Sequence, residues 1–96
     1  MTSNHDKTAE RLARKEGVEY NQGQGPDVNS TRRAIEVETA DTARDGLRQL
    51  QGFKKPVYIA AANAEATQAA LEAAAGTTVG VMNSQGKIVK RSTRRR

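Results

Sequence analysis

The chain has no cysteine, a single histidine and no tryptophan, and aromatic residues make up only 3% of its 96 residues. Without cysteine it forms neither disulfides nor thiolate metal sites, and such a composition is typical of intracellular proteins. We therefore expect a cytoplasmic location. No apolar run approaches the roughly 20 residues that a membrane helix requires, so we expect no membrane association.

Hydrophobic residues are also scarce, at 35% of the chain with a mean hydropathy of −0.79. A chain of this length buries about 60–65% of the surface that its unfolded form exposes, so the core should be thin. We predict one domain over residues 1–91, with residues 1–4 disordered. Whether a homodimer supplements this core stays open.

Positive charge is abundant but unevenly distributed. The net charge is +5, and six of the sixteen lysines and arginines lie in the last ten residues, which leaves ten against eleven acidic residues elsewhere. We predict that residues 92–96 form a basic, disordered tail. Such a tail either only aids solubility or contacts the phosphate backbone of a nucleic acid.

The hydrophobic periodicity predicts an α/β domain, a small mixed sheet with flanking helices. The expected order is helix, hairpin, strand, helix, strand, helix and terminal hairpin. The apolar run 57–61 should be a central, parallel strand that is reached through a crossover helix. Helices are expected at 6–16, 43–50 and 64–75, and further strands at 32–39, 77–82 and 87–90.

A short segment alternates apolar and acidic residues in the way that is typical of a strand with one buried face. Ile35 and Val37 should point into the core, and Glu36 and Glu38 should lie on the opposite face, roughly 6.5–7 Å apart at their Cα atoms. The polar turn at residues 29–31 places Asp27 on the facing arm of a hairpin, where it should oppose Glu36.

Three carboxylates in one place form an all-oxygen cluster. Such a cluster suits Mg²⁺ or Mn²⁺ better than zinc, for which the chain offers no cysteine and one histidine. We therefore predict a metal site formed by Asp27, Glu36 and Glu38. The alternative is a strand with one solvated face and no ligand.

Pro26-Asp27 followed by Glu36-Val37-Glu38 resembles the PD-(D/E)xK motif of the restriction-endonuclease-like nuclease superfamily. The order of elements from residue 6 to residue 62 is similar to that of the archaeal Holliday-junction resolvases in this superfamily. The resemblance implies a restriction-endonuclease-like core, a magnesium-dependent endonuclease activity and DNA as the partner. Glu38 stands where the family has a lysine, although a few members with glutamate there still cleave.

The resemblance also extends to residues outside the motif. It implies a helix-borne glutamate before the motif, which corresponds to Glu10, and a glutamine in the following helix, which corresponds to Gln49 or Gln51. The catalytic residues that it implies are Glu10, Asp27, Glu36, Glu38 and Gln51. His5, near the N-terminus, is given no role.

Basic residues in three places are candidates for binding nucleic acid, with an ordinary solvated surface as the alternative. They are Arg11, Arg14 and Lys15 in the first helix, Arg32 and Arg33 near the hairpin tip, and Lys90, Arg91, Arg94, Arg95 and Arg96 at the end of the chain.

Three functions remain open from the sequence. The first is a metal-dependent nuclease-like protein that acts on or binds nucleic acid. The second is a catalytically inactive nucleic-acid-binding or structural protein on the same fold, which the replacement of the lysine favours. The third is a small α/β protein with no role on nucleic acid.

Overall fold

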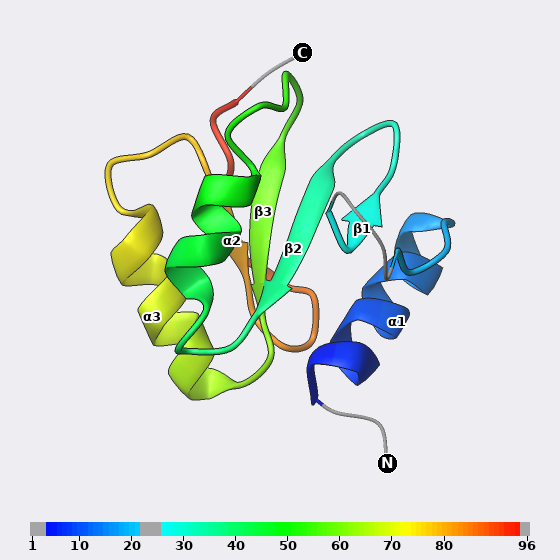
Figure 1. Cartoon of the computed structure of the whole chain (residues 1–96), viewed down its shortest axis with the longest axis horizontal. Coiled ribbons are helices and arrows are strands. Elements are labelled where there is room, and N and C mark those ends of the chain that lie inside the picture. Colours follow the sequence, from blue (N-terminus) through cyan, green and yellow to red (C-terminus); the bar gives the residue numbers. More distant parts are fainter. Residues whose placement is uncertain (1–3, 22–25, 95–96) are drawn as a thin grey trace.

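The computed structural model describes residues 4–21 and 26–94, which form one five-stranded sheet with helices on both faces (Figure 1). The helices are α1 (Asn4–Glu16), α2 (Ala43–Gln49) and α3 (Ala64–Ala74). The strands are β1 (Val28–Asn29), β2 (Ala34–Glu38), β3 (Val57–Ala61), β4 (Gly80–Met82) and β5 (Ile88–Lys90).

The strands follow the order of the sequence across the sheet, from β1 to β5. β2, β3 and β4 run parallel, while β1 and β5 pair antiparallel at the two edges. The helices α2 and α3 are the crossovers that parallel neighbours require. The predicted α/β class, with a small mixed sheet, flanking helices and a central strand at 57–61, is confirmed.

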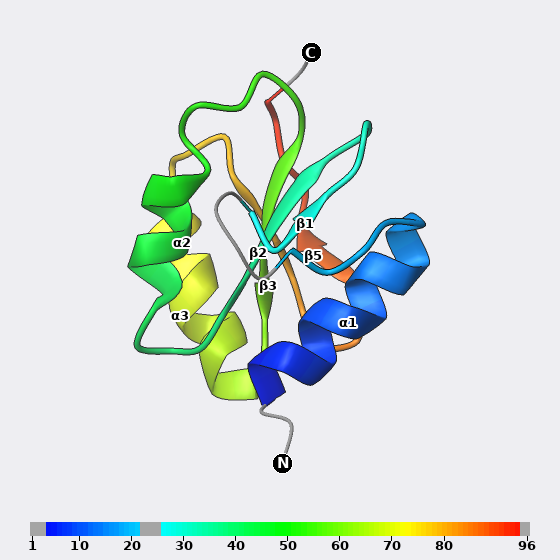
Figure 2. The ribbon, with the colours of Figure 1, turned by 45° about the vertical axis from the view of Figure 1, so that its right-hand side comes forward.

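The two faces of the sheet have separate cores. Figure 2 shows α1 on the opposite side of the sheet from α2 and α3. On the α1 side, Leu12 packs with Ile35 and Val37. On the other side, Leu50 and Ile59 pack with the alanines of α3. Both cores are thin, as expected from the scarcity of large apolar residues.

The ends of α3 explain why this alanine-rich segment forms a helix. The Asn63 side chain accepts a hydrogen bond from the Ala66 amide at 2.8 Å, which caps the first turn. Gly76 has a φ of +77° shortly after the last turn, a conformation that glycine adopts without strain. Ala66, Ala70 and Ala74 are buried, so the helix lies close to the sheet.

The end of the chain differs from the prediction of a disordered tail. Ser92 Oγ accepts a hydrogen bond from the Val57 amide and donates one to the Thr78 carbonyl at 2.8 Å. The Thr93 amide donates to the same carbonyl. Residues 92–94 are therefore docked against the sheet, because their polar groups satisfy backbone groups of other strands. Residues 95 and 96 lie outside the described residues.

The N-terminal boundary also differs from the expected one. Helix α1 begins at Asn4, so residue 4 is part of the helix and not of a disordered end. Residues 1–3 lie outside the described residues. Within the part of the chain that the structure describes, none of the helices is both long enough and apolar enough to cross a lipid bilayer.

Candidate functional site

The pairing of β1 with β2 places Asp27 opposite Glu36. Val28 pairs with Ile35, so Asp27, just before β1, faces Glu36, the next residue on β2. The backbone amide of Asp27 donates a hydrogen bond to the Glu36 carboxylate. In return, Asp27 Oδ2 accepts a hydrogen bond from the Val37 amide at 2.9 Å. Asp27 and Glu36 therefore lie opposite each other on the hairpin, as the alternating pattern predicted.

The face that carries the glutamates is not solvated, and this corrects the alternative of a wet strand face. Glu36 is 4% exposed and Glu38 is 7% exposed, because α2 crosses over them. Gly46 of α2 allows this close approach, since a Cβ atom there would lie 2.6 Å from Glu38 Cγ. All five residues of β2 are buried, which an alternating sequence pattern does not predict.

Burial changes the protonation of both glutamates. The pKa of Glu36 is raised to about 8, first by burial and then by the nearby negative charges of Asp27 and Glu38. Burial also raises the pKa of Glu38, against the opposing effect of a hydrogen bond from Thr42. The two glutamates are hydrogen-bonded to each other. Such a pair holds a proton that an exposed pair would release near pH 4.5.

A glutamine of α2 completes the surroundings of Glu36. With its amide nitrogen turned toward the carboxylate, Gln49 donates to the two Glu36 oxygens at 3.3 and 3.2 Å. Gln51, the glutamine that the resemblance favoured, is exposed in the turn after α2. The difference arises because α2 ends at Gln49, so Gln51 lies beyond the helix that covers Glu36.

His5, for which the sequence predicts no role, lies beside this site in the first turn of α1. Its Nε2 lies 3.3 Å from Asp27 Oδ2, and its Nδ1 lies 3.2 Å from the Tyr20 hydroxyl. Tyr20 in turn donates a hydrogen bond to Asp6 Oδ1 at 2.8 Å. The sequence carries no local signal for this network, because its members are brought together only by the tertiary fold.

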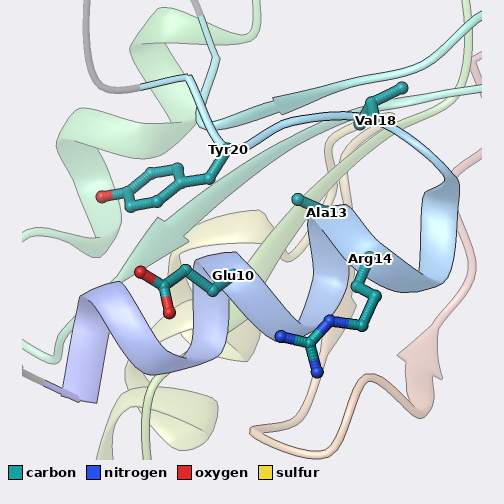
Figure 3. A pocket seen from close by; sticks show the side chains of 5 residues that line it. All are labelled: Glu10, Ala13, Arg14, Val18 and Tyr20. Carbon is teal, nitrogen blue, oxygen red and sulfur yellow. The ribbon is translucent and has the colours of Figure 1, made fainter.

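Glu10 lies on the exposed side of α1, close enough to Tyr20 for its negative charge to help raise the pKa of that hydroxyl. It lines a shallow pocket of about 300 Å³ between α1 and residues 18–20 (Figure 3). Figure 3 shows Glu10 and Arg14 projecting from the helix on one side of this pocket, with Tyr20 on the other side. The acid of α1 that accepts a hydrogen bond from Tyr20 is Asp6, one helical turn before Glu10.

Several candidate residues for nucleic-acid binding are engaged within the protein instead. Arg33 pairs with Glu16 at 3.2 Å and lies over the Tyr58 ring. Lys90 donates to the Val79 carbonyl at 2.6 Å, just before β4. Arg94 donates to the carbonyls of the α2 end and the following loop. The side chains of Arg33, Lys90 and Arg94 already bind acceptors within the protein, so they are poor candidates for phosphate contacts.

The remaining candidates are more accessible. Arg14 is exposed on α1, and Arg91 is exposed after β5. The Arg32 side chain is 66% exposed and lies 3.9 Å from Glu16, which is a weak contact. Arg11 and Lys15 reach carbonyls of the turn between β4 and β5 but stay largely exposed. Arg95 and Arg96 lie outside the described residues.

The donor set can be compared with what a divalent cation requires. Asp27, Glu36 and Glu38 offer oxygen atoms only, which is the chemistry that Mg²⁺ and Mn²⁺ prefer. Over residues 4–21 and 26–94, however, no three histidine or acidic side chains are already arranged as ligands of a metal ion. The donor atoms are of the right type for such a cation, but their present arrangement does not form a metal site, and Glu36 and Glu38 are hydrogen-bonded to each other.

Comparisons with protein-family models, with curated proteins and with solved structures gave no match to this chain. The resemblance to the nuclease motif therefore depends on the residues and the order of elements alone.

Proposed function

We propose that this chain is a cytoplasmic, metal-dependent, nuclease-like protein that binds nucleic acid, with DNA as the expected form. The cation, Mg²⁺ or Mn²⁺, would be held by Asp27, Glu36 and Glu38. The observation that supports this most is the pair of buried glutamates on β2, Glu36 and Glu38, with the partly buried Asp27 opposite Glu36. Burying acidic groups costs free energy. Buried acidic groups with shifted pKa values are therefore more frequent at functional sites than elsewhere in proteins.

The chain's own residues prepare the carboxylates for this role. Gln49 donates to both oxygens of Glu36 and limits its rotation. Thr42 hydrogen-bonds Glu38 from the segment before α2. When bound, the cation would lower the pKa of a water molecule and stabilise negative charge that develops on a phosphate. Its uptake requires the glutamate pair to release the proton that it holds at neutral pH.

The exposed arginine side chains suggest which surface contacts the nucleic acid. Arg14 projects from α1, and Arg32 lies near the end of the same helix, 3.9 Å from Glu16. The cluster of acids contacts the first turn of α1 through His5. A nucleic-acid backbone that lies along α1 would therefore meet arginine side chains at one end of the helix and the proposed metal site at the other.

The proposal is tested by incubating labelled single-stranded and duplex DNA with the full chain in Mn²⁺ or Mg²⁺. We expect cleavage by the wild type and none by Glu36→Gln, with DNA affinity in the absence of metal unchanged or higher for the variant. Glu65→Gln, an exposed acid of α3, is the matched control and should cleave like the wild type. Cleavage that survives Glu36→Gln would contradict the proposed site.

A catalytically inactive nucleic-acid-binding protein is the second candidate. Two observations favour it: Glu38 replaces the lysine of the family, and the two glutamates hydrogen-bond each other and are not spread around a common point. The same experiment separates the candidates, because an inactive protein would bind DNA without cleaving it under any metal condition. Binding of neither DNA form would reject DNA as the partner in both candidates.

A further inference from the structure

The segment after α1 runs back beside the helix and forms a pocket with it. The Val18 amide donates a hydrogen bond to the Ala13 carbonyl at 2.9 Å, which ties the start of this segment to the helix. The Val18 side chain packs against the core on the α1 face. The pocket between α1 and residues 18–20 has a volume of about 300 Å³, and Ala13 and Val18 provide its apolar lining (Figure 3).

Tyr20 forms an aromatic wall of this pocket and is held at both ends of its side chain. The ring packs against the same core as Val18. The hydroxyl donates a hydrogen bond to Asp6 Oδ1 at 2.8 Å and lies 3.2 Å from His5 Nδ1. The pKa of Tyr20 is raised above its ordinary value, first by burial and then by the hydrogen bond to Asp6, so the hydroxyl keeps its proton. Fixed aromatic rings are surfaces on which unpaired nucleobases stack.

Glu10 and Arg14 provide opposite charges on the helix side of the pocket. They are one helical turn apart and project from the same side of α1 (Figure 3). Both side chains are exposed, and in the part of the chain that the structure describes neither has a hydrogen bond or an ion pair, even with the other. The pocket therefore presents a carboxylate acceptor and a guanidinium donor to a ligand, beside an aromatic ring.

The chemistry of these groups favours one nucleobase. A volume of about 300 Å³ is at the lower end of the range for ligand pockets, so the pocket suits a single base better than a larger ligand. Guanine is the base that carries two neighbouring donors, N1–H and the N2 amino group, on its Watson–Crick edge, and the two oxygens of a carboxylate accept both. Thymine has one N–H between two carbonyl groups, which the Glu10 carboxylate would repel.

We propose that the pocket between α1 and residues 18–20 binds an unpaired guanine base of a nucleic-acid strand. The base would stack on Tyr20 with its Watson–Crick edge on the Glu10 carboxylate, and Arg14 would contact a neighbouring phosphate. This inference depends on the nucleic-acid binding of the proposed function and requires no metal ion. It gives the α1 surface a preference for single strands and for one base, which charge alone does not provide.

The test is fluorescence anisotropy with labelled single-stranded thymidine oligomers of about 12 nucleotides, in the presence of a metal chelator. One oligomer contains only thymine, and a second has one guanine at its centre. We expect the wild type to bind the guanine oligomer about tenfold more tightly, because a bidentate contact to a base gives discrimination of this order. Hypoxanthine at the same position keeps N1–H but lacks the N2 amino group, so its oligomer should bind with intermediate affinity.

Two variants of acidic residues identify the group that recognises the base. Glu10→Gln should bind the two oligomers with nearly equal affinity, and its affinity for the thymine oligomer should be unchanged or higher, because a negative charge is lost. Glu19→Gln makes the same change on an exposed side chain outside the described lining of the pocket, and should keep the preference. Arg14→Ala should weaken the binding of both oligomers by a similar factor, because phosphate contacts carry no sequence information.

The outcomes distinguish this inference from the function on which it depends. If the wild type binds neither the single strands nor a duplex, the proposed nucleic-acid binding is wrong and the inference falls with it. If the wild type binds only the duplex, or binds both oligomers equally, the guanine pocket alone is wrong. A guanine preference that persists in Glu10→Gln, or that Glu19→Gln also loses, would overturn the assignment of Glu10 as the group that binds the base.

Discussion

Gly46 of α2 lies directly over the side chain of Glu38, with no space for a Cβ atom between them. Such an atom would lie 2.6 Å from Glu38 Cγ and 2.9 Å from its Oε1. A glycine inside a helix costs about 1 kcal/mol relative to alanine. The chain keeps this glycine because it allows α2 to cover the acidic face of β2.

Replacing Gly46 by alanine tests this packing. We expect Gly46→Ala to lower the free energy of unfolding by about 1–3 kcal/mol, because the overpacking outweighs the gain in helix propensity. Gly52→Ala, where a Cβ atom would meet nothing within 4 Å, is the control and should change little. Urea unfolding measures both. A Gly46→Ala protein more stable than the wild type would show that α2 does not press on Glu38.

The raised pKa of Glu36 makes stability depend on pH. The folded protein holds a proton on Glu36 up to about pH 8, whereas the group's ordinary pKa is 4.5. Because the folded state binds more protons between these values, this group's contribution to the free energy of unfolding falls as pH rises, by up to about 1.4 kcal/mol per pH unit. Below pH 4.5 both states are protonated and the penalty disappears.

Glu36→Gln should therefore flatten the pH dependence between 4.5 and 8. We expect the variant to be more stable than the wild type by a few kcal/mol at pH 8, in the absence of metal. Thermal unfolding at several pH values measures this, with exposed Glu65→Gln as the control. Parallel curves for the wild type and Glu36→Gln would mean that the Glu36 carboxyl titrates normally.

Arg94 fastens the end of the chain to α2. Its guanidinium donates to the carbonyls of Leu50 and Phe53 and to the Thr78 hydroxyl. We expect Arg94→Ala to cost about 1–3 kcal/mol, because carbonyl groups at a helix end lose their donor. Exposed Arg91→Ala should stay within about 0.5 kcal/mol of the wild type. Equal unfolding midpoints for the two variants would show that Arg94 is free in solution.

The exposed arginine side chains near α1 should determine the salt dependence of DNA binding. For Arg14→Ala and Arg32→Ala we expect weaker binding and a slope of log affinity against log salt that is flatter by up to about 0.9 per lost phosphate contact. Arg44→Ala removes the same charge from α2, on the other face of the sheet, and should leave the slope unchanged. Fluorescence anisotropy at several salt concentrations measures this. A flatter slope for Arg44→Ala alone would move the interface to the α2 face.

Local patterns in the sequence predicted much of the fold and part of the site. Period-2 alternation and the polar turn at residues 29–31 were sufficient to oppose Asp27 and Glu36. The same alternation could not show that α2 covers the glutamates, because solvated and covered acidic faces have the same pattern. The signal that was missed is Gly46, a glycine in the middle of an otherwise regular helix.

The remaining differences arise from contacts between distant segments. His5 and Asp27 are 22 positions apart, and neither has a neighbour that marks it as a partner of the other. Arg94 was expected in a disordered tail because four arginines in six residues are typical of one. Its docking depends on backbone carbonyls at the end of α2, which composition does not reveal.

The central claim, a divalent cation held by Asp27, Glu36 and Glu38, is tested most directly by NMR with substoichiometric Mn²⁺. The paramagnetic ion broadens amide signals near its binding site. We predict selective broadening around these three residues in the wild type, and its loss in both Asp27→Asn and Glu36→Gln. Broadening that is absent, or that persists unchanged in both variants, would contradict the claim.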